Sequence, residues 1–186
     1  MTRRILITIE YNGESFVGWQ RQDNGPSVQT VIEDAAKAFI HAPVKVVGAG
    51  RTDAGVHATG QAAHIDVPEK FTSNQVMEAL NAHLSSVPVT IQSASEVPGD
   101  FHARFSAIGR RYLYRILPRR QPPALDKGRV WHLKHKLDPK PMVGAAKHLL
   151  GRHDFTSFRA SQCQAKSPFR TLDRLDIETS GDEIHI

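Results

Sequence analysis

Residues 48 to 57 of the chain read Gly48-Ala49-Gly50-Arg51-Thr52-Asp53-Ala54-Gly55-Val56-His57. This decapeptide lies between two apolar stretches, residues 44–47 and 60–67, which we expect to be strands. Its three glycines allow the backbone to come close to a ligand. Asp53 has an arginine two residues before it and an imidazole four residues after it, and a nearby arginine keeps a carboxylate ionised. The pattern is typical of a nucleophile or base that stays charged in a cleft.

Two other interpretations of the decapeptide stay open. It could be an ordinary turn with an exposed Arg51–Asp53 ion pair, but such a pair contributes only ~0–1 kcal/mol, so stability gives little reason for it. It could also belong to a metal-dependent hydrolase that uses His57 and His64 with Asp53. The spacing of these residues matches no compact zinc pattern, and we expect no bound metal.

The composition indicates a globular chain with an excess of positive charge. Of its 186 residues, 40% are hydrophobic and 23% are charged, which fits one large domain or two small lobes and excludes a disordered chain. A net charge of +5 and a pI of about 9.6 favour a polyanionic partner. The arginines concentrate in one stretch: Arg104, Arg110, Arg111, Arg115, Arg119 and Arg120. The alternative is that this stretch is simply a solvated face.

Several protein classes are disfavoured by what the sequence lacks. Cys163 is the single cysteine, so an intrachain disulfide is impossible, and we expect this residue to be structural or incidental. The first ten residues do not resemble a signal peptide. No apolar run approaches the ~20 residues of a membrane span. We therefore expect a cytoplasmic protein without membrane contact.

The first half of the chain predicts strands and capped helices. Alternating isoleucines at positions 5, 7 and 9 indicate a strand, and residues 88–97 indicate another. Ser27 is a candidate N-cap for one helix, and Thr72 with Gln75 forms a candidate capping box for a second. The first helix carries an apolar stripe of Val28, Val31, Ile32, Ala35, Ala36 and Phe39.

The second half of the chain has less regular patterns. Residues 110–117 predict a long strand with Tyr112 on one face, and strands are also expected at 171–179 and 183–186. Asp138 and Pro139 mark a helix start, and Gly151 can close that helix. Three prolines within residues 118–123 mark a lobe boundary or an exposed connection.

Two features of the layout concern the chain as a whole. Each half contains a helix, a loop with an arginine (Arg51 or Arg159) and a strand, which favours an ancient duplication only slightly over coincidence. The chain also stops at Ile186 inside an alternating strand, and an unpaired apolar edge is a liability. We therefore expect a sequence that has been cut short.

Five blocks of the sequence, in this order, resemble the tRNA pseudouridine synthases of the TruA type. These blocks are Tyr11-Asn12-Gly13 with Phe16-Val17-Gly18-Trp19-Gln20-Arg21-Gln22; residues 48–58 with Gly60-Gln61; Asp100-Phe101-His102-Ala103-Arg104-Phe105-Ser106-Ala107; Arg111-Tyr112-Leu113-Tyr114; and Asp154-Phe155-Thr156-Ser157-Phe158-Arg159. They cover nearly the whole chain.

The resemblance implies a fold and a set of roles. The fold would be α+β, with antiparallel sheets covered by helices in two similar lobes and a catalytic cleft between them. Residues 1–108 would form the catalytic lobe, and residues 109–186 would begin a second, incomplete lobe. Asp53 would be the catalytic aspartate and Arg51 its companion, with Tyr112 the active-site tyrosine and Arg159 near the carboxylate.

The resemblance also implies the substrate and the partners. Family members isomerise uridines in the anticodon arm of tRNA without metal or cofactor, and they are typically homodimers. They continue beyond this chain, so its activity and dimerisation are in doubt, and the alternative is an RNA-binding fragment that cannot catalyse.

Pseudouridine formation moves the ribose from N1 to C5 of uracil, so it needs no redox partner. An aspartate can act as nucleophile or electrostatic stabiliser, as in glycosidases, and Tyr112 can provide a flat wall or help a base. The target base must be flipped out of its stem-loop, which costs a few kcal/mol. Phosphate contacts can offset this cost, and the candidates are Arg110, Arg111, Arg115, Arg119 and Arg120, then Arg21 and His57.

The aromatic residues have two possible roles. Trp19 is either a core residue or a residue that positions its loop near RNA. Phe101, Phe105 and Phe155 are expected to lie in the core.

Overall fold

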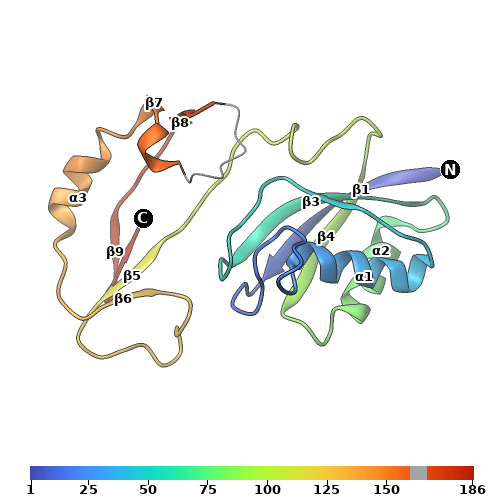
Figure 1. The fold of residues 1–186 in the computed structure, drawn as a ribbon, viewed down its shortest axis with the longest axis horizontal. Helices are drawn as coiled ribbons and strands as arrows, with labels where there is room; N and C mark the ends of the chain where they lie inside the picture. Colours follow the sequence, from blue (N-terminus) through green and yellow to red (C-terminus); the bar gives the residue numbers. More distant parts are fainter. Residues whose placement is uncertain (160–166) are drawn as a thin grey trace. The chain divides into compact units, whose positions relative to one another are not determined.

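The computed structural model describes residues 1–159 and 167–186, so the expectation for Cys163 lies outside the described residues. The chain divides into two compact units, Met1–Arg110 and Arg111–Ile186, each with its own sheet (Figure 1). Within the described residues, no helix combines the length and the apolar character that crossing a bilayer requires.

The first unit is a four-stranded antiparallel sheet with helices on one face (Figure 1). Its spatial strand order is β2-β3-β1-β4. The strands are β1 (Thr2–Tyr11), β2 (Val46–Gly48), β3 (Ala58–Pro68) and β4 (Val89–Val97), and the helices are α1 (Val28–Ile40) and α2 (Ser73–His83). Antiparallel strands were expected for this half of the chain, and the structure confirms them.

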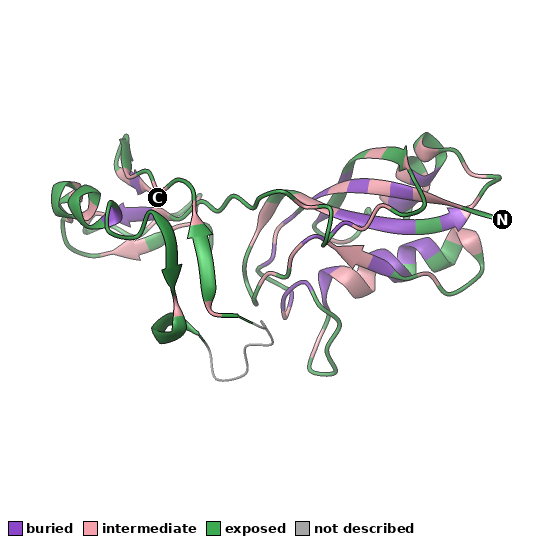
Figure 2. Cartoon of the chain, turned by 90° about the horizontal axis from the view of Figure 1, so that it is seen from above, coloured by how far each residue is buried: buried purple, intermediate pink, exposed green. Residues whose placement is uncertain are grey.

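Alternation along β1 builds the core of the first unit. Ile5, Ile7 and Ile9 have no exposed surface, and they form one hydrophobic core with the buried residues of β3 and α1. Ile5 pairs with Ile65 of β3, which is also fully buried. Burying one such side chain stabilises the fold by about 1.5–3 kcal/mol. Figure 2 shows buried positions of this unit in purple on its strands and helices.

Both helix starts predicted for the first unit are confirmed. The Ser27 hydroxyl accepts the amide of Thr30 at 3.1 Å, which satisfies one of the donors left without a partner in the first turn of α1. At the start of α2 the Thr72 hydroxyl accepts the Gln75 amide, and the Gln75 side chain accepts the Thr72 amide at 2.9 Å. This reciprocal pair is the expected capping box.

The second unit has a small sheet and a separate pair of strands. Its sheet order is β6-β5-β10-β9, with β5 and β6 parallel and the other pairs antiparallel. The elements are β5 (Arg115–Pro118), β6 (Trp131–Leu133), α3 (Pro139–Ala146), β7 (Gly151–Asp154), the 3-10 turn η1 (Thr156–Phe158), β8 (Phe169–Leu172), β9 (Glu178–Ser180) and β10 (Glu183–His185). Most of this unit is exposed in Figure 2.

Three expectations for the second unit are wrong in extent. The strand expected at 110–117 is the shorter strand β5, Arg115–Pro118, because its antiparallel partner β10 has only three residues. One further pair of backbone hydrogen bonds joins Tyr114 to Ile186. The strand expected at 171–179 is divided between β8 and β9. The helix that starts at Pro139, with its predicted cap Asp138, ends at Ala146 instead of continuing to Gly151.

Candidate active site

Asp53 lies on an exposed loop between β2 and β3. We call residues 48–57 the Asp53 loop. Among the residues that the structure describes, the Asp53 carboxylate makes no hydrogen bond and no ion pair, although Asp53 is exposed and Arg51 is two residues away. The Arg51–Asp53 surface pair considered from the sequence is therefore not formed. A carboxylate without a protein partner on an ordered loop is available to a ligand.

The loop is held by residues 11–19, the end of β1 and the segment after it, which we call the bracing segment. The backbone amide of Trp19 donates to the Thr52 carbonyl oxygen at 3.0 Å, and the amide of Gly55 donates to the carbonyl oxygen of Phe16 at 3.4 Å. The Tyr11 hydroxyl lies 2.7 Å from the Thr52 hydroxyl. These contacts anchor the loop on both sides of Asp53.

Two glycines allow the bracing segment to come this close. A Cβ at Gly13 would lie 1.9 Å from the Val56 carbonyl oxygen, which no real contact reaches. A Cβ at Gly18 would lie 2.6 Å from the Thr52 carbonyl oxygen, and the φ angle of Gly18 is +117°, a region that other residues rarely adopt. The glycines of the bracing segment thus matter as much as those of the loop itself.

The two ends of the Asp53 loop have further anchors. At its end, the Gly13 amide donates to Nδ1 of His57 at 3.1 Å, so this half-buried imidazole is engaged through one nitrogen. At its start, Nε2 of Gln61 donates to the Gly50 carbonyl oxygen at 2.7 Å. Nη2 of Arg110 donates to the Ala49 carbonyl oxygen at the same distance. Arg110, predicted to contact phosphate, therefore also touches the loop.

A buried carboxylate that the sequence analysis missed fixes the strand before the loop. Glu33 of α1 is 8% exposed, and it accepts the backbone amide of Val46 at 3.0 Å. Its second partner is Arg21, whose Nη2 lies 2.5 Å away. Gln29 also donates to the carbonyl oxygen of Val46. The spacing of Gln29 and Glu33, four residues apart on one helical face, was the available signal.

The core role considered for Trp19 is confirmed, and its role in positioning its loop near RNA stays a prediction. Its side chain is 3% exposed and belongs to the core, with its ring centroid 6.2 Å from that of Tyr11. Its backbone amide supports the Asp53 loop. The residue is therefore a core aromatic that also positions the loop.

Other predicted residues lie in the second unit. Tyr112 is 61% exposed. Arg111 and Arg120 are exposed too, and within the described part of the chain neither side chain forms a hydrogen bond or ion pair. Arg159 is exposed and directly follows η1. The structure describes the two units separately, so it does not place these residues against Asp53.

In the second unit, two arginines of the predicted phosphate-binding set have acidic partners. Arg115 donates to both oxygens of Glu183, at 2.8 and 2.6 Å, and to Asp126 at 3.0 Å. The hydrogen bonds that Arg115 donates to Glu183, with a further one from His185, lower the pKa of Glu183 to about 2. Arg119 lies 3.4 Å from Asp182. The charge of Arg115 is thus compensated within the sheet of its unit.

His64 is a structural residue in this fold. It is 4% exposed, and its Nδ1 accepts the Ala103 amide at 3.1 Å. Burial, followed by the nearby charge of Arg4, lowers the pKa of His64. The described residues contain no cluster of three or more His, Cys, Asp or Glu side chains that could hold a metal ion.

The expectation that all three phenylalanines lie in the core is wrong for Phe105. This side chain is 79% exposed, because the turn that carries it is closed by hydrogen bonds from the Phe105 and Ser106 amides to the His102 carbonyl oxygen. Its ring lies 4.4 Å from the His102 ring, centroid to centroid. Phe101 and Phe155 are half-buried.

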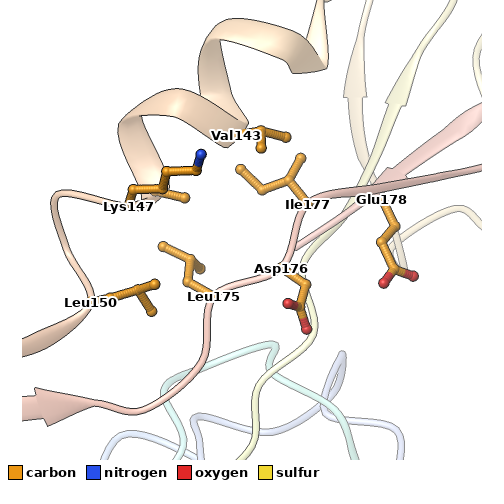
Figure 3. Close-up of a pocket in the computed structure, with 8 residues that line it drawn as sticks. Val143, Lys147, Leu150, Leu175, Asp176, Ile177 and Glu178 are labelled. Carbon is orange, nitrogen blue, oxygen red and sulfur yellow. The ribbon is translucent and has the colours of Figure 1, made fainter.

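A hollow of about 300 Å³ lies in the second unit between α3 and residues 175–178 (Figure 3). Apolar side chains of Val143, Leu150, Leu175 and Ile177 point into it, and Lys147 lies at its edge. It contains none of the residues predicted for the site. Its lining also includes the carboxylates of Asp176 and Glu178.

Comparison with known proteins identifies the class to which this fold and loop belong. The model of the tRNA pseudouridine synthase family matches residues 7–106 and 145–186, and the chain belongs to this family. The resemblance inferred from the five sequence blocks is therefore confirmed.

Individual relatives carry the name tRNA pseudouridine synthase A. The chain is 52% identical over 183 residues to the protein of Rhodospirillum rubrum, 53% over 184 residues to that of Rhodospirillum centenum, and 54% over 183 residues to that of Beijerinckia indica. The matched regions cover 98 to 99% of this chain but only 66%, 75% and 70% of these relatives, respectively.

Proposed function

We propose that this protein converts uridine to pseudouridine in the anticodon arm of tRNA, with Asp53 as the nucleophile. The observation that carries the proposal is the exposed Asp53 carboxylate, which has no partner among the described residues and lies on a loop anchored from both sides. Membership of the family supports the reaction class, and tRNA is the substrate in the relatives' names.

The chemistry requires little beyond such a carboxylate. The bond between N1 of uracil and the ribose breaks, a bond between C5 and the ribose forms, and the C5 hydrogen leaves as a proton while N1 gains one. Substrate and product are isomers, so no electrons or groups are exchanged with another molecule. A carboxylate can attack the reacting ring or stabilise the charge that develops there.

The remaining roles extend the proposal to the second unit. Tyr112 would stack on the detached base or assist removal of the C5 proton, and its exposed side chain is accessible for this. Arg51 and Arg159 would assist Asp53. The homodimer and the cytoplasmic location expected from the sequence stay predictions.

Phosphate binding falls first to Arg111 and Arg120, which are exposed and whose side chains have no partner among residues 1–159 and 167–186. Arg110, Arg21 and His57 form a second group, because each already has a contact within the first unit. Arg115 and Arg119 would have to give up protein partners to contact RNA.

Tritium release from tRNA labelled at C5 of uridine tests the proposal, because the reaction discards that hydrogen to water. The full chain is compared with Asp53→Asn, which keeps the shape of the side chain and removes its charge. We expect release from the parent, none from Asp53→Asn, and equal tRNA binding by both. Asp34→Asn, on the exposed side of α1, is the matched control and should retain parental turnover.

Turnover by a pure Asp53→Asn preparation would contradict the proposed role of Asp53. The second candidate function is tRNA binding without isomerisation, which is considered because the chain covers only 66 to 75% of the relatives named above. Binding by the parent without any release of tritium would establish this second function instead.

A further inference from the structure

A buried hydroxyl of the first unit points at the residue before Asp53. Tyr11 is 3% exposed, and its hydroxyl oxygen lies 2.7 Å from Oγ1 of Thr52. A buried tyrosine hydroxyl needs a hydrogen-bond partner, since leaving it without one is costly. The contact therefore ties the core of the unit to the Asp53 loop.

The backbone of Tyr11 is well suited to serve as a fixed point. Tyr11 is the last residue of β1, which pairs with a strand on each side, and it lies opposite Ala58 of β3 and Val89 of β4. The register of β1 shifts just before it, between Ile9 and Tyr11 on the β3 side. Such irregularities re-aim side chains and are common next to active sites.

Thr52 receives two anchors at once. Its hydroxyl contacts Tyr11, and its carbonyl oxygen accepts the amide of Trp19 at 3.0 Å. Together they fix the peptide unit that leads into Asp53. Removing the Tyr11 hydroxyl leaves the backbone hydrogen bond in place, so the loop should persist with a less well-defined position.

We propose that Tyr11 is a positioning residue for the reaction at Asp53, acting through the hydroxyl of Thr52. In this role Tyr11 contacts the Thr52 hydroxyl and supplies no proton or charge to the substrate. It restricts where the carboxylate lies. This inference rests on the proposed function, and it predicts an effect on the chemical step and none on tRNA binding.

The test compares Tyr11→Phe, Thr52→Val and Thr52→Ser in the full chain by tritium release. Because a misplacement of ~1 Å can cost a factor of ~100, we expect kcat to fall roughly 10- to 100-fold in Tyr11→Phe and Thr52→Val, with KM unchanged. Thr52→Ser keeps the hydroxyl and should retain most of the activity. Thr90→Val, at an exposed position of β4, is the matched control.

The double variant separates positioning from general damage. If both residues act through one hydrogen bond, Tyr11→Phe with Thr52→Val should lose no more than either single variant. A value of kcat in Tyr11→Phe within about twofold of the parent would overturn the inference, as would a rise in KM with kcat unchanged. With Asp53→Asn inactive in the same experiment, such a result leaves the proposed function intact.

Amide hydrogen exchange gives a second readout that does not depend on turnover. The inference predicts faster exchange of the Trp19 amide in Tyr11→Phe, because the acceptor on Thr52 becomes mobile, with unchanged protection of Ile7 in the core of β1. Equal protection of the Trp19 amide in parent and variant would overturn the inference even if the parent shows no turnover.

Discussion

Replacing Gly13 by alanine would place a methyl group where the Asp53 loop already has backbone. The new Cβ would lie 1.9 Å from the Val56 carbonyl oxygen, and contacts below 3.0 Å essentially never occur. The loop must therefore move away by about 1 Å, or the bracing segment must do so. A displacement of ~1 Å at a reacting group can lower the rate by ~100-fold. Overpacking of this kind also costs about 1–3 kcal/mol of stability.

Tritium release and thermal unfolding measure the two consequences in the same preparation. We expect kcat/KM of Gly13→Ala to fall by about 100-fold and the melting temperature to fall by several degrees. Gly99→Ala is the control, because a Cβ there meets no atom within 4 Å, and it should behave as the parent. Parental turnover by Gly13→Ala would refute the claim that the bracing segment determines the position of the loop.

Three further predictions concern charge and capping. The pKa of Glu183 is lowered from 4.5 to about 2, so its ion pair with Arg115 stabilises the fold fully above pH 4.5, and this stability is lost as the pH falls towards 2. Glu183→Gln should therefore lower the free energy of unfolding by about 1 kcal/mol at pH 7, after allowance for solvent screening, and an equally large loss at pH 2 would contradict this. The double variant Arg111→Ala, Arg120→Ala should bind tRNA with a weaker salt dependence: the magnitude of the negative slope of log K for binding against log salt concentration should fall by about 1.5, with kcat unchanged. An unchanged slope would exclude phosphate contacts by these two arginines. Ser27→Ala should cost about 1 kcal/mol in denaturant unfolding because the N-cap of α1 is lost, and equal stability would contradict the capping role.

Local signals predicted the first unit well. Ser27 and the Thr72–Gln75 pair define helix starts through contacts three residues apart, and the alternation in β1 defines a face without reference to any partner strand. The second unit was harder to predict, because the length of β5 depends on how many residues β10 offers to it. A sequence pattern does not contain that information.

For the candidate site as well, features carried by neighbouring residues were predictable, and contacts between residues far apart in the sequence were not. The glycines and Asp53 identified the loop from its composition alone. The contact between Tyr11 and Thr52 joins residues 41 positions apart, and that between Arg115 and Glu183 joins residues 68 apart, so neither left a local pattern. For the same reason, the sequence showed where arginines gather but not which of them already have partners.

Mapping of pseudouridine along tRNA after incubation with the chain tests the central claim most directly, because it reads both the product and its position. We expect new pseudouridine in the anticodon arm with the parent protein and none with Asp53→Asn. Modification at the same positions by Asp53→Asn would contradict a nucleophilic role for Asp53.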